Sequence, residues 1–312
     1  MSWEALMSTY PASIRQAVRP DQEELVTHPE HCSADPDRLA TIGVEVGQQV
    51  RVRRTASRYG LYTVSETRCE RPEDVVRMGA AGRRRLGISD GCSGVVDSQV
   101  PHPTFSERKA RANNEFIERL ADDGAQAFLI ALAPHGGGIE PRTDRQAERV
   151  TSRLGPAAAS SWRCKGWNED GDPVETWHIT SADLDERSFP LLASVIARGF
   201  AHAVAFHGFR RDEILVGGAA RPEVKEEIRG RIETATADPS IPVLVAGDGD
   251  PFGGNEARNL VNRITASRTN GIQIEQSSTA RSRHWRAIAD AVADFYLDLA
   301  AGAPSDPGRR ER

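Results

Sequence analysis

The decisive stretch of this sequence is Ala131-Leu132-Ala133-Pro134-His135-Gly136-Gly137-Gly138-Ile139-Glu140. The apolar run over residues 125–133, before the histidine, predicts a buried strand. Residues 144–154 predict a helix, which Gly155 and Pro156 end. His135 and Glu140 are therefore expected on a strand-to-helix loop, at the carboxyl end of the strand. Open α/β sheets place their ligands at that edge.

Two interpretations fit this loop. Imidazole and carboxylate are good zinc ligands, and three consecutive glycines let a short backbone segment curve tightly without crowding an ion. A glycine-rich turn that carries a polar histidine and a solvated glutamate explains the same residues equally well. A third ligand elsewhere in the chain decides between the two.

Composition narrows the class of protein. The chain has 312 residues, of which 38% are hydrophobic, enough for one sizeable core or two. A formal net charge of −5 argues against nucleic acid as a partner. The four cysteines form no CxxC pair, which is typical of reduced thiols in the cytoplasm. Without an apolar leader or a long apolar run we expect no signal peptide and no membrane contact, so that extracellular action would follow release by lysis.

The chain divides into four predicted segments. Residues 1–37 are polar and rich in proline, which predicts an extended or partly disordered arm. Residues 38–100 predict a small β-rich module, with strands over 48–54 and 60–64 and a short helix over 72–78. A proline-flanked linker at 100–104 leads into an α/β domain over 105–301. Residues 302–312 form a predicted disordered tail.

Strands and helices alternate along the α/β domain. This alternation predicts a mixed or mostly parallel sheet with helices on both faces. Helices are expected over 106–124, 189–198, 222–236, 254–265 and 284–299. Further strands are expected over 160–164, 174–179, 201–206, 241–246 and 271–275.

His207 supplies the third ligand. It ends an apolar strand and precedes Gly208, as His135 precedes Gly136. Two strand-terminal histidines and Glu140 make a His-Glu-His set that leaves the fourth zinc position to water, as in catalytic sites. Glu275 ends the strand over 271–275, where it can act as the proton-transferring base or as a fourth ligand. Strand position alone leaves both roles open.

Arginines follow the same strand ends and indicate an anionic substrate, because a guanidinium binds a carboxylate in bidentate fashion. Arg142 and Arg263 are the two we expect to bind substrate, together with the neighbouring Asn262. Two further histidines, His28 and His31, are expected to face solvent.

These motifs together resemble a known family, the phage-type poly-γ-glutamate hydrolases. The resemblance covers roughly residues 105–300 and rests on the segments 134–141, 206–208, 262–263 and 271–275. It implies a zinc-carboxypeptidase-like α/β fold and makes 105–301 a zinc hydrolase domain. It also implies one zinc per chain held by His135, Glu140 and His207, with Glu275 as the catalytic carboxylate. The implied substrate is a γ-linked glutamate polymer.

Two alternatives to this function remain open. A deacylase of N-acyl amino acids or aminoacyl esters has the same architecture and takes a small acyl amino acid as its partner. A non-catalytic module would instead grip a polyanion through the basic strand over residues 48–54. Substrate comparison separates the first alternative from the hydrolase, and zinc binding separates the second.

Overall fold

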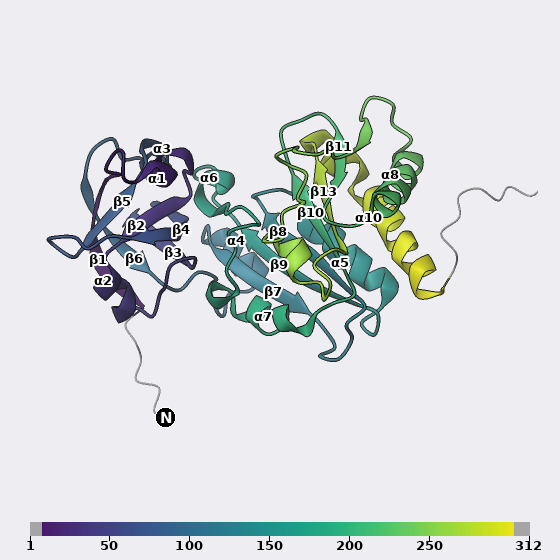
Figure 1. Cartoon of the computed structure of the whole chain (residues 1–312), viewed down its shortest axis with the longest axis horizontal. Helices are drawn as coiled ribbons and strands as arrows, with labels where there is room; N and C mark the ends of the chain where they lie inside the picture. The colour runs from purple at the N-terminus through teal and green to yellow at the C-terminus, as the bar shows by residue number, and fades with distance from the viewer. Residues whose placement is uncertain (1–7, 303–312) are drawn as a thin grey trace, which may run out of the picture. The chain divides into compact units, whose positions relative to one another are not determined.

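The computed structural model describes residues 8–302, and these form two compact units (Figure 1). The first unit contains the described residues as far as Ile117 together with Gly166–Ala193. The second contains Glu118–Lys165 and the described residues from Ser194 onward. The domain limits at residues 100–105 and 301 stay predictions, and the predicted tail lies outside the described residues except for Gly302.

The first unit is built on a closed barrel with the strand order β1-β5-β2-β4-β3-β6. Its strands are β1 (Thr9–Gln16), β2 (His31–Ala34), β3 (Gln49–Thr55), β4 (Arg58–Thr67), β5 (Val75–Met78) and β6 (Cys92–Asp97). Short helices α1 (Glu23–Thr27), α2 (Pro36–Thr41) and α3 (Ala80–Arg85) connect them. Alternate side chains such as Val50 and Val52 are buried in the barrel core, so the predicted β-rich module is confirmed over β3 and β4.

The expectation of a disordered arm is wrong for residues 9–34. Strand β1 pairs in parallel with β5 and antiparallel with β6, and β2 lies between β5 and β4. Tyr10, Ala12 and Ile14 alternate with polar residues and enter the core, a period-two pattern that the nearby prolines obscure. The helix expected over 72–78 is also wrong, because Val75 and Val76 are buried in β5.

The remaining elements of the first unit are short. They are the α-helices α4 (Glu107–Ala112), α6 (Pro173–Trp177) and α7 (Pro190–Ala193) and the 3-10 helix η1 (Glu186–Ser188). Ser106 caps α4 as its sequence position predicts, but the helix ends at Ala112 and β7 (Phe116–Ala121) replaces its expected second half. The strand expected over 174–179 is instead α6, because Asp172 caps a helix that Pro173 begins.

The second unit is organised by a seven-stranded sheet with the order β12-β11-β13-β10-β8-β9-β7. The strands after β7 are β8 (Leu129–Gly137), β9 (Ala159–Gly166), β10 (His202–Gly208), β11 (Ile214–Gly217), β12 (Val243–Val245) and β13 (Gly271–Gln276). Strands β8, β10 and β13 run parallel, whereas β11 is antiparallel to β13. The sheet is therefore mixed, as predicted.

Three long helices cover one face of this sheet. Helices α5 (Thr143–Leu154), α8 (Pro222–Thr236) and α10 (Ser278–Ala300) pack on one another and share a core with Val204, Phe206, Ile272 and Ile274. Helix α8 has the predicted bounds. The short helix α9 (Leu260–Arg263) packs against β13 at Gly271. Successive residues of a strand point to opposite faces, so Gly271 lies on the face opposite to that of Ile272 and Ile274, and α9 covers that second face.

Three of the expected helices have other bounds in the structure. The helix expected over 189–198 is divided between α7 and the 3-10 helix η2 (Ile196–Arg198), and that over 254–265 forms only at α9, which Asn259 caps. Helix α10 begins at Ser278 rather than His284, because Ser277 caps it. None of the helices within residues 8–302 is long and apolar enough to span a membrane.

One ion pair ties the edge of the sheet to the segment before β10. Asp122 Oδ1 and Oδ2 accept hydrogen bonds from the two terminal nitrogens of Arg198 at 2.6 and 2.7 Å. Ser160 Oγ donates to the same carboxylate from β9. These bonds, led by the one from Arg198, lower the pKa of Asp122 to about 2.

We predict that Asp122→Asn destabilises the protein near neutral pH by about 1–2 kcal/mol, after allowance for solvent screening. Because the pKa of Asp122 is depressed in the folded state, its contribution is present above the unfolded value of roughly 3.9 and is lost as the pH falls toward 2. Urea unfolding near neutral pH and at about pH 3 measures this, with the gap between variant and parent shrinking in acid. The exposed Asp212→Asn is the control, and an equal gap at both pH values contradicts the assignment.

Candidate active site

The glycine loop after β8 is closed by a backbone hydrogen bond from Glu140 N to His135 O, 2.8 Å long. His135 lies within the end of β8 rather than beyond it. Gly137 has a φ of +72°, and a Cβ on Gly136 would lie 2.6 Å from Asp144 Cβ and 2.7 Å from Cys164 O. The glycines therefore permit both the tight curve and the close packing of α5 against the strand end.

The loop brings two side chains of the predicted ligand set together. His135 Nδ1 lies 3.2 Å from Glu140 Oε1. His207, at the end of β10, places its Nδ1 3.2 Å from His135 Nδ1 and 3.6 Å from Glu140 Oε2. The two histidines are each 3% exposed and Glu140 is 6% exposed.

These distances fit a tetrahedral metal ion. Bond lengths of about 2.0–2.1 Å in a zinc site place neighbouring ligand atoms roughly 3.3 Å apart. The separations of 3.2, 3.2 and 3.6 Å among one oxygen pair and two imidazole nitrogens lie around that value. Burial would raise the pKa of Glu140, but the adjacent His135 and His207 lower it well below its usual range. The carboxylate is therefore ready to bind a cation.

Glu275 lies beside this triangle. Its position on β13 is directly paired with His207 on β10. The Gln273 side chain donates to Glu275 Oε1 at 3.0 Å, and Asn259 donates to Gln273 at 2.9 Å, so a relay of amides orients the carboxylate. Burial, with Glu140 adding to it, raises the pKa of Glu275 to about 7, against the opposing effect of His207 and Arg281.

Arg281 is one of the arginines that follow the strand ends, and sequence reasoning preferred Arg142 and Arg263 to it. It lies in the first turn of α10, is 8% exposed, and donates to Pro141 O at 3.3 Å. Burial lowers its pKa, and the charges of Glu140 and Glu275 oppose that change. Its signal was the cap at Ser277: an earlier start of the last helix places Arg281 on the buried side, one turn after the cap.

The three predicted substrate-binding residues lie in different environments. Arg142 is the N-cap residue of α5 and has a φ of +85°, and its guanidinium lies 6.0 Å from the centroid of the Trp285 ring. Arg263 is half-buried at the end of α9. Asn262 is fully buried, accepts a bond from Ala219 N, and donates to the carbonyls of residues 254 and 256. Its amide thus holds two loops together.

Two buried imidazoles and two buried carboxylates at neighbouring strand ends have the layout of an enzyme site. A model of the poly-γ-glutamate hydrolase family matches residues 104–291. The chain therefore belongs to this family.

The individual proteins that this chain resembles share low sequence identity with it. The SPbeta prophage-derived UPF0714 protein YoqZ of Bacillus subtilis (strain 168) is 25% identical over 182 residues, which cover 58% of this chain and 60% of that protein. A solved bacteriophage poly-γ-glutamate hydrolase is 23% identical with a TM-score of 0.47, covering 60% of this chain and 90% of that one. A structure described as YNDL-apo (Zinc-free) is 22% identical with a TM-score of 0.46, covering 60% and 94%.

Close packing at Gly208 gives a test of Arg281. A Cβ on Gly208 would lie 2.4–2.8 Å from the Arg281 guanidinium, so Gly208→Ala must displace that group. We predict that hydrolytic activity falls roughly 100-fold, as a displacement of about 1 Å can cause, while the unfolding midpoint changes little because a side-chain end can move. Gly230→Ala, in α8 with nothing within 4 Å of the added Cβ, should leave activity unchanged. Full activity of Gly208→Ala would contradict a role for Arg281.

Proposed function

We propose that this chain is a zinc-dependent hydrolase that cleaves the amide bonds of poly-γ-glutamate. One zinc ion is held by His135, Glu140 and His207, in a domain of the zinc-carboxypeptidase-like type. The single observation that carries the metal assignment is the close approach of three side chains: the two imidazole Nδ1 atoms lie 3.2 Å apart, and the two Glu140 oxygens lie 3.2 Å from His135 and 3.6 Å from His207. Family membership supplies the substrate class.

Zinc, when bound, polarises a carbonyl and lowers the pKa of a coordinated water. Glu275 then moves the proton. Its Oε1 accepts the Gln273 amide, which leaves Oε2 to take a proton from the attacking water and to return it to the departing nitrogen. Its pairing with His207 keeps this carboxylate next to the ligands, and the amide relay from Asn259 holds it in one orientation.

The polymer substrate carries a carboxylate on each residue, and arginines bind it. Arg281 interacts electrostatically with Glu140 and Glu275 and packs against Gly208, next to His207, so it stabilises negative charge that develops on the scissile carbonyl oxygen. Arg142 and Arg263 bind substrate carboxylates nearer the protein surface. Asn262 contributes by fixing α9, which carries Arg263.

The zinc assignment predicts that His207→Ala binds one equivalent of zinc less than the parent chain and loses hydrolysis of poly-γ-glutamate. Removing one of three protein ligands leaves too few to hold the ion. Metal analysis after dialysis, with an activity assay, measures both effects. His202→Ala is the matched control, because His202 lies at the opposite end of the same strand and packs against Phe128 and Tyr296. Equal zinc content in His207→Ala and the parent would rule the ligand set out.

The role of Glu275 is tested separately. Glu275→Gln keeps the shape of the side chain but cannot carry the proton, so we expect about 10²–10⁴-fold lower activity with zinc content unchanged. The exposed Glu256→Gln should match the parent. Loss of zinc along with activity would make Glu275 a fourth ligand instead. If the parent hydrolyses small N-acyl amino acids and leaves poly-γ-glutamate intact, the deacylase replaces the proposed substrate.

A further inference from the structure

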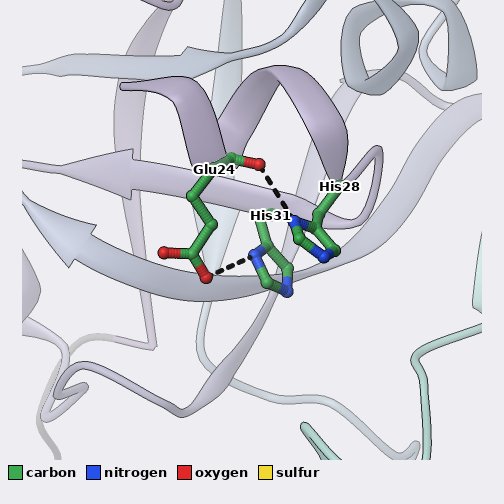
Figure 2. Close-up of side chains that lie close together, drawn as sticks. All are labelled: Glu24, His28 and His31. Carbon is green, nitrogen blue, oxygen red and sulfur yellow. Dashed lines mark hydrogen bonds and ion pairs between the residues drawn. The ribbon is translucent and has the colours of Figure 1, made fainter. Parts of the chain in front are cut away.

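A second group of metal-binding side chains lies on the barrel, outside the site described above. Glu24 and His28 are four residues apart, on α1 and at its C-cap, and His31 begins β2 (Figure 2). One ligand atom from each of the three lies within 4.8 Å of the others. The backbone turn between the histidines is closed by a hydrogen bond from His31 N to His28 O, 3.1 Å long.

His31 is held with one nitrogen committed. The expectation that it faces solvent is wrong, since it is only 4% exposed. Its Nε2 lies 2.9 Å from Asp183 Oδ2 in the same unit. A carboxylate only accepts, so Nε2 carries a proton, and in the neutral ring Nδ1 keeps its lone pair. Carboxylates hold metal-binding histidines in this way, fixing the tautomer and the ring orientation.

The other nitrogen of His31 faces a second carboxylate. His31 Nδ1 lies 3.2 Å from Glu24 Oε1, as the dashed line in Figure 2 marks. The contact does not have the alignment of a hydrogen bond, and Nδ1 is buried without any hydrogen-bond partner. A lone pair and a carboxylate at this distance repel each other unless a cation lies between them.

His28 offers the third ligand atom. Its Nδ1 lies 3.2 Å from the carbonyl oxygen of Glu24, which can only accept, so Nδ1 is the donor and Nε2 keeps its lone pair. The ring is exposed and stacks on that of His31, with centroids 4.7 Å apart. Because the two rings are nearly parallel, His28 must rotate out of this stack to direct Nε2 at a shared ion, and its exposed position leaves room for that rotation.

We infer that Glu24, His28 and His31 form a second metal site, on the barrel, which binds a divalent transition metal of the zinc class. Two imidazoles and one carboxylate are the ligand set that zinc accepts, with water completing the coordination. Helix α3 packs directly on the turn between the two histidines, because a Cβ on Gly82 of α3 would lie only 2.9 Å from Pro29 O. This contact holds the turn in place.

A proton is the competing occupant of the same position. Burial lowers the pKa of His31, but Asp183 and the nearby Glu30 and Glu24 outweigh it and raise the pKa overall. An imidazolium between two carboxylates would satisfy the charges without a metal. When zinc binds, it replaces that proton at Nδ1 and the proton passes to solvent. Metal stoichiometry distinguishes the two occupants.

The experiment is a zinc titration of the full chain and of three variants by equilibrium dialysis against Zn²⁺ alone. Glu24→Ala and His28→Ala each remove a ligand at an exposed position, and Glu23→Ala removes a neighbouring exposed carboxylate from the same helix. We expect the first two to bind one equivalent fewer than the parent, and Glu23→Ala to match it. Hydrolytic activity should be the same in all four, which also shows that each is folded.

A further variant tests the support from Asp183. Asp183→Asn should weaken zinc binding at this site roughly 10–100-fold, the usual effect of losing a carboxylate behind a metal-binding histidine. Equal zinc content in the parent, Glu24→Ala and His28→Ala would overturn the inference and leave the proton as the occupant. Because each comparison counts the difference from the parent, the result is independent of whether the strand-end site binds zinc.

Discussion

The backbone hydrogen bond from Glu140 to His135 is the constraint on which the strand-end site depends. It closes a five-residue step in the chain at 2.8 Å and so fixes how far the carboxylate lies from the imidazole. No side chain needs to contribute to this closure, which is why three of the four intervening residues can be glycine. Everything else at the site is positioned against this pair: His207 by its strand, and Glu275 by its pairing with His207.

The cost of burying these groups explains why they lie together. Four ionisable side chains are each less than 8% exposed: His135, Glu140, His207 and Glu275. An isolated buried charge is strongly unfavourable, and burial without a partner would neutralise it instead. The opposite pKa shifts of the two carboxylates follow from this, because the imidazoles lie beside Glu140 whereas Glu275 has mainly an amide for a partner. The proposed cation, held by the first three, would balance the charge of the whole group.

The sequence predicted the parts of this fold that local chemistry determines. The helix over Pro222–Thr236 follows from the proline at its start, and the strand from Gly271 follows from its apolar residues. The three predicted ligands lie within 3.6 Å of one another. The sequence could not predict what depends on pairing across the chain. Tyr10, Ala12 and Ile14 are buried only because β5 and β6 accept β1 between them. Asn262 looks like a surface ligand beside Arg263, yet its partners are carbonyls of a loop that no local pattern locates.

The two histidine-glycine pairs show how one sequence pattern meets two different physical needs. After His135, the missing Cβ of Gly136 makes room for Asp144 and the Cys164 carbonyl, so the glycine allows helix α5 to pack closely against the strand end. After His207, the missing Cβ of Gly208 makes room for the Arg281 guanidinium, so the glycine allows a charged group to lie against the strand end. In both cases the position at which a Cβ would block a neighbouring group is the residue directly after a predicted ligand at a strand end. A glycine in that place therefore marks a strand end that another group must reach, and the partner is found only when the chain is folded.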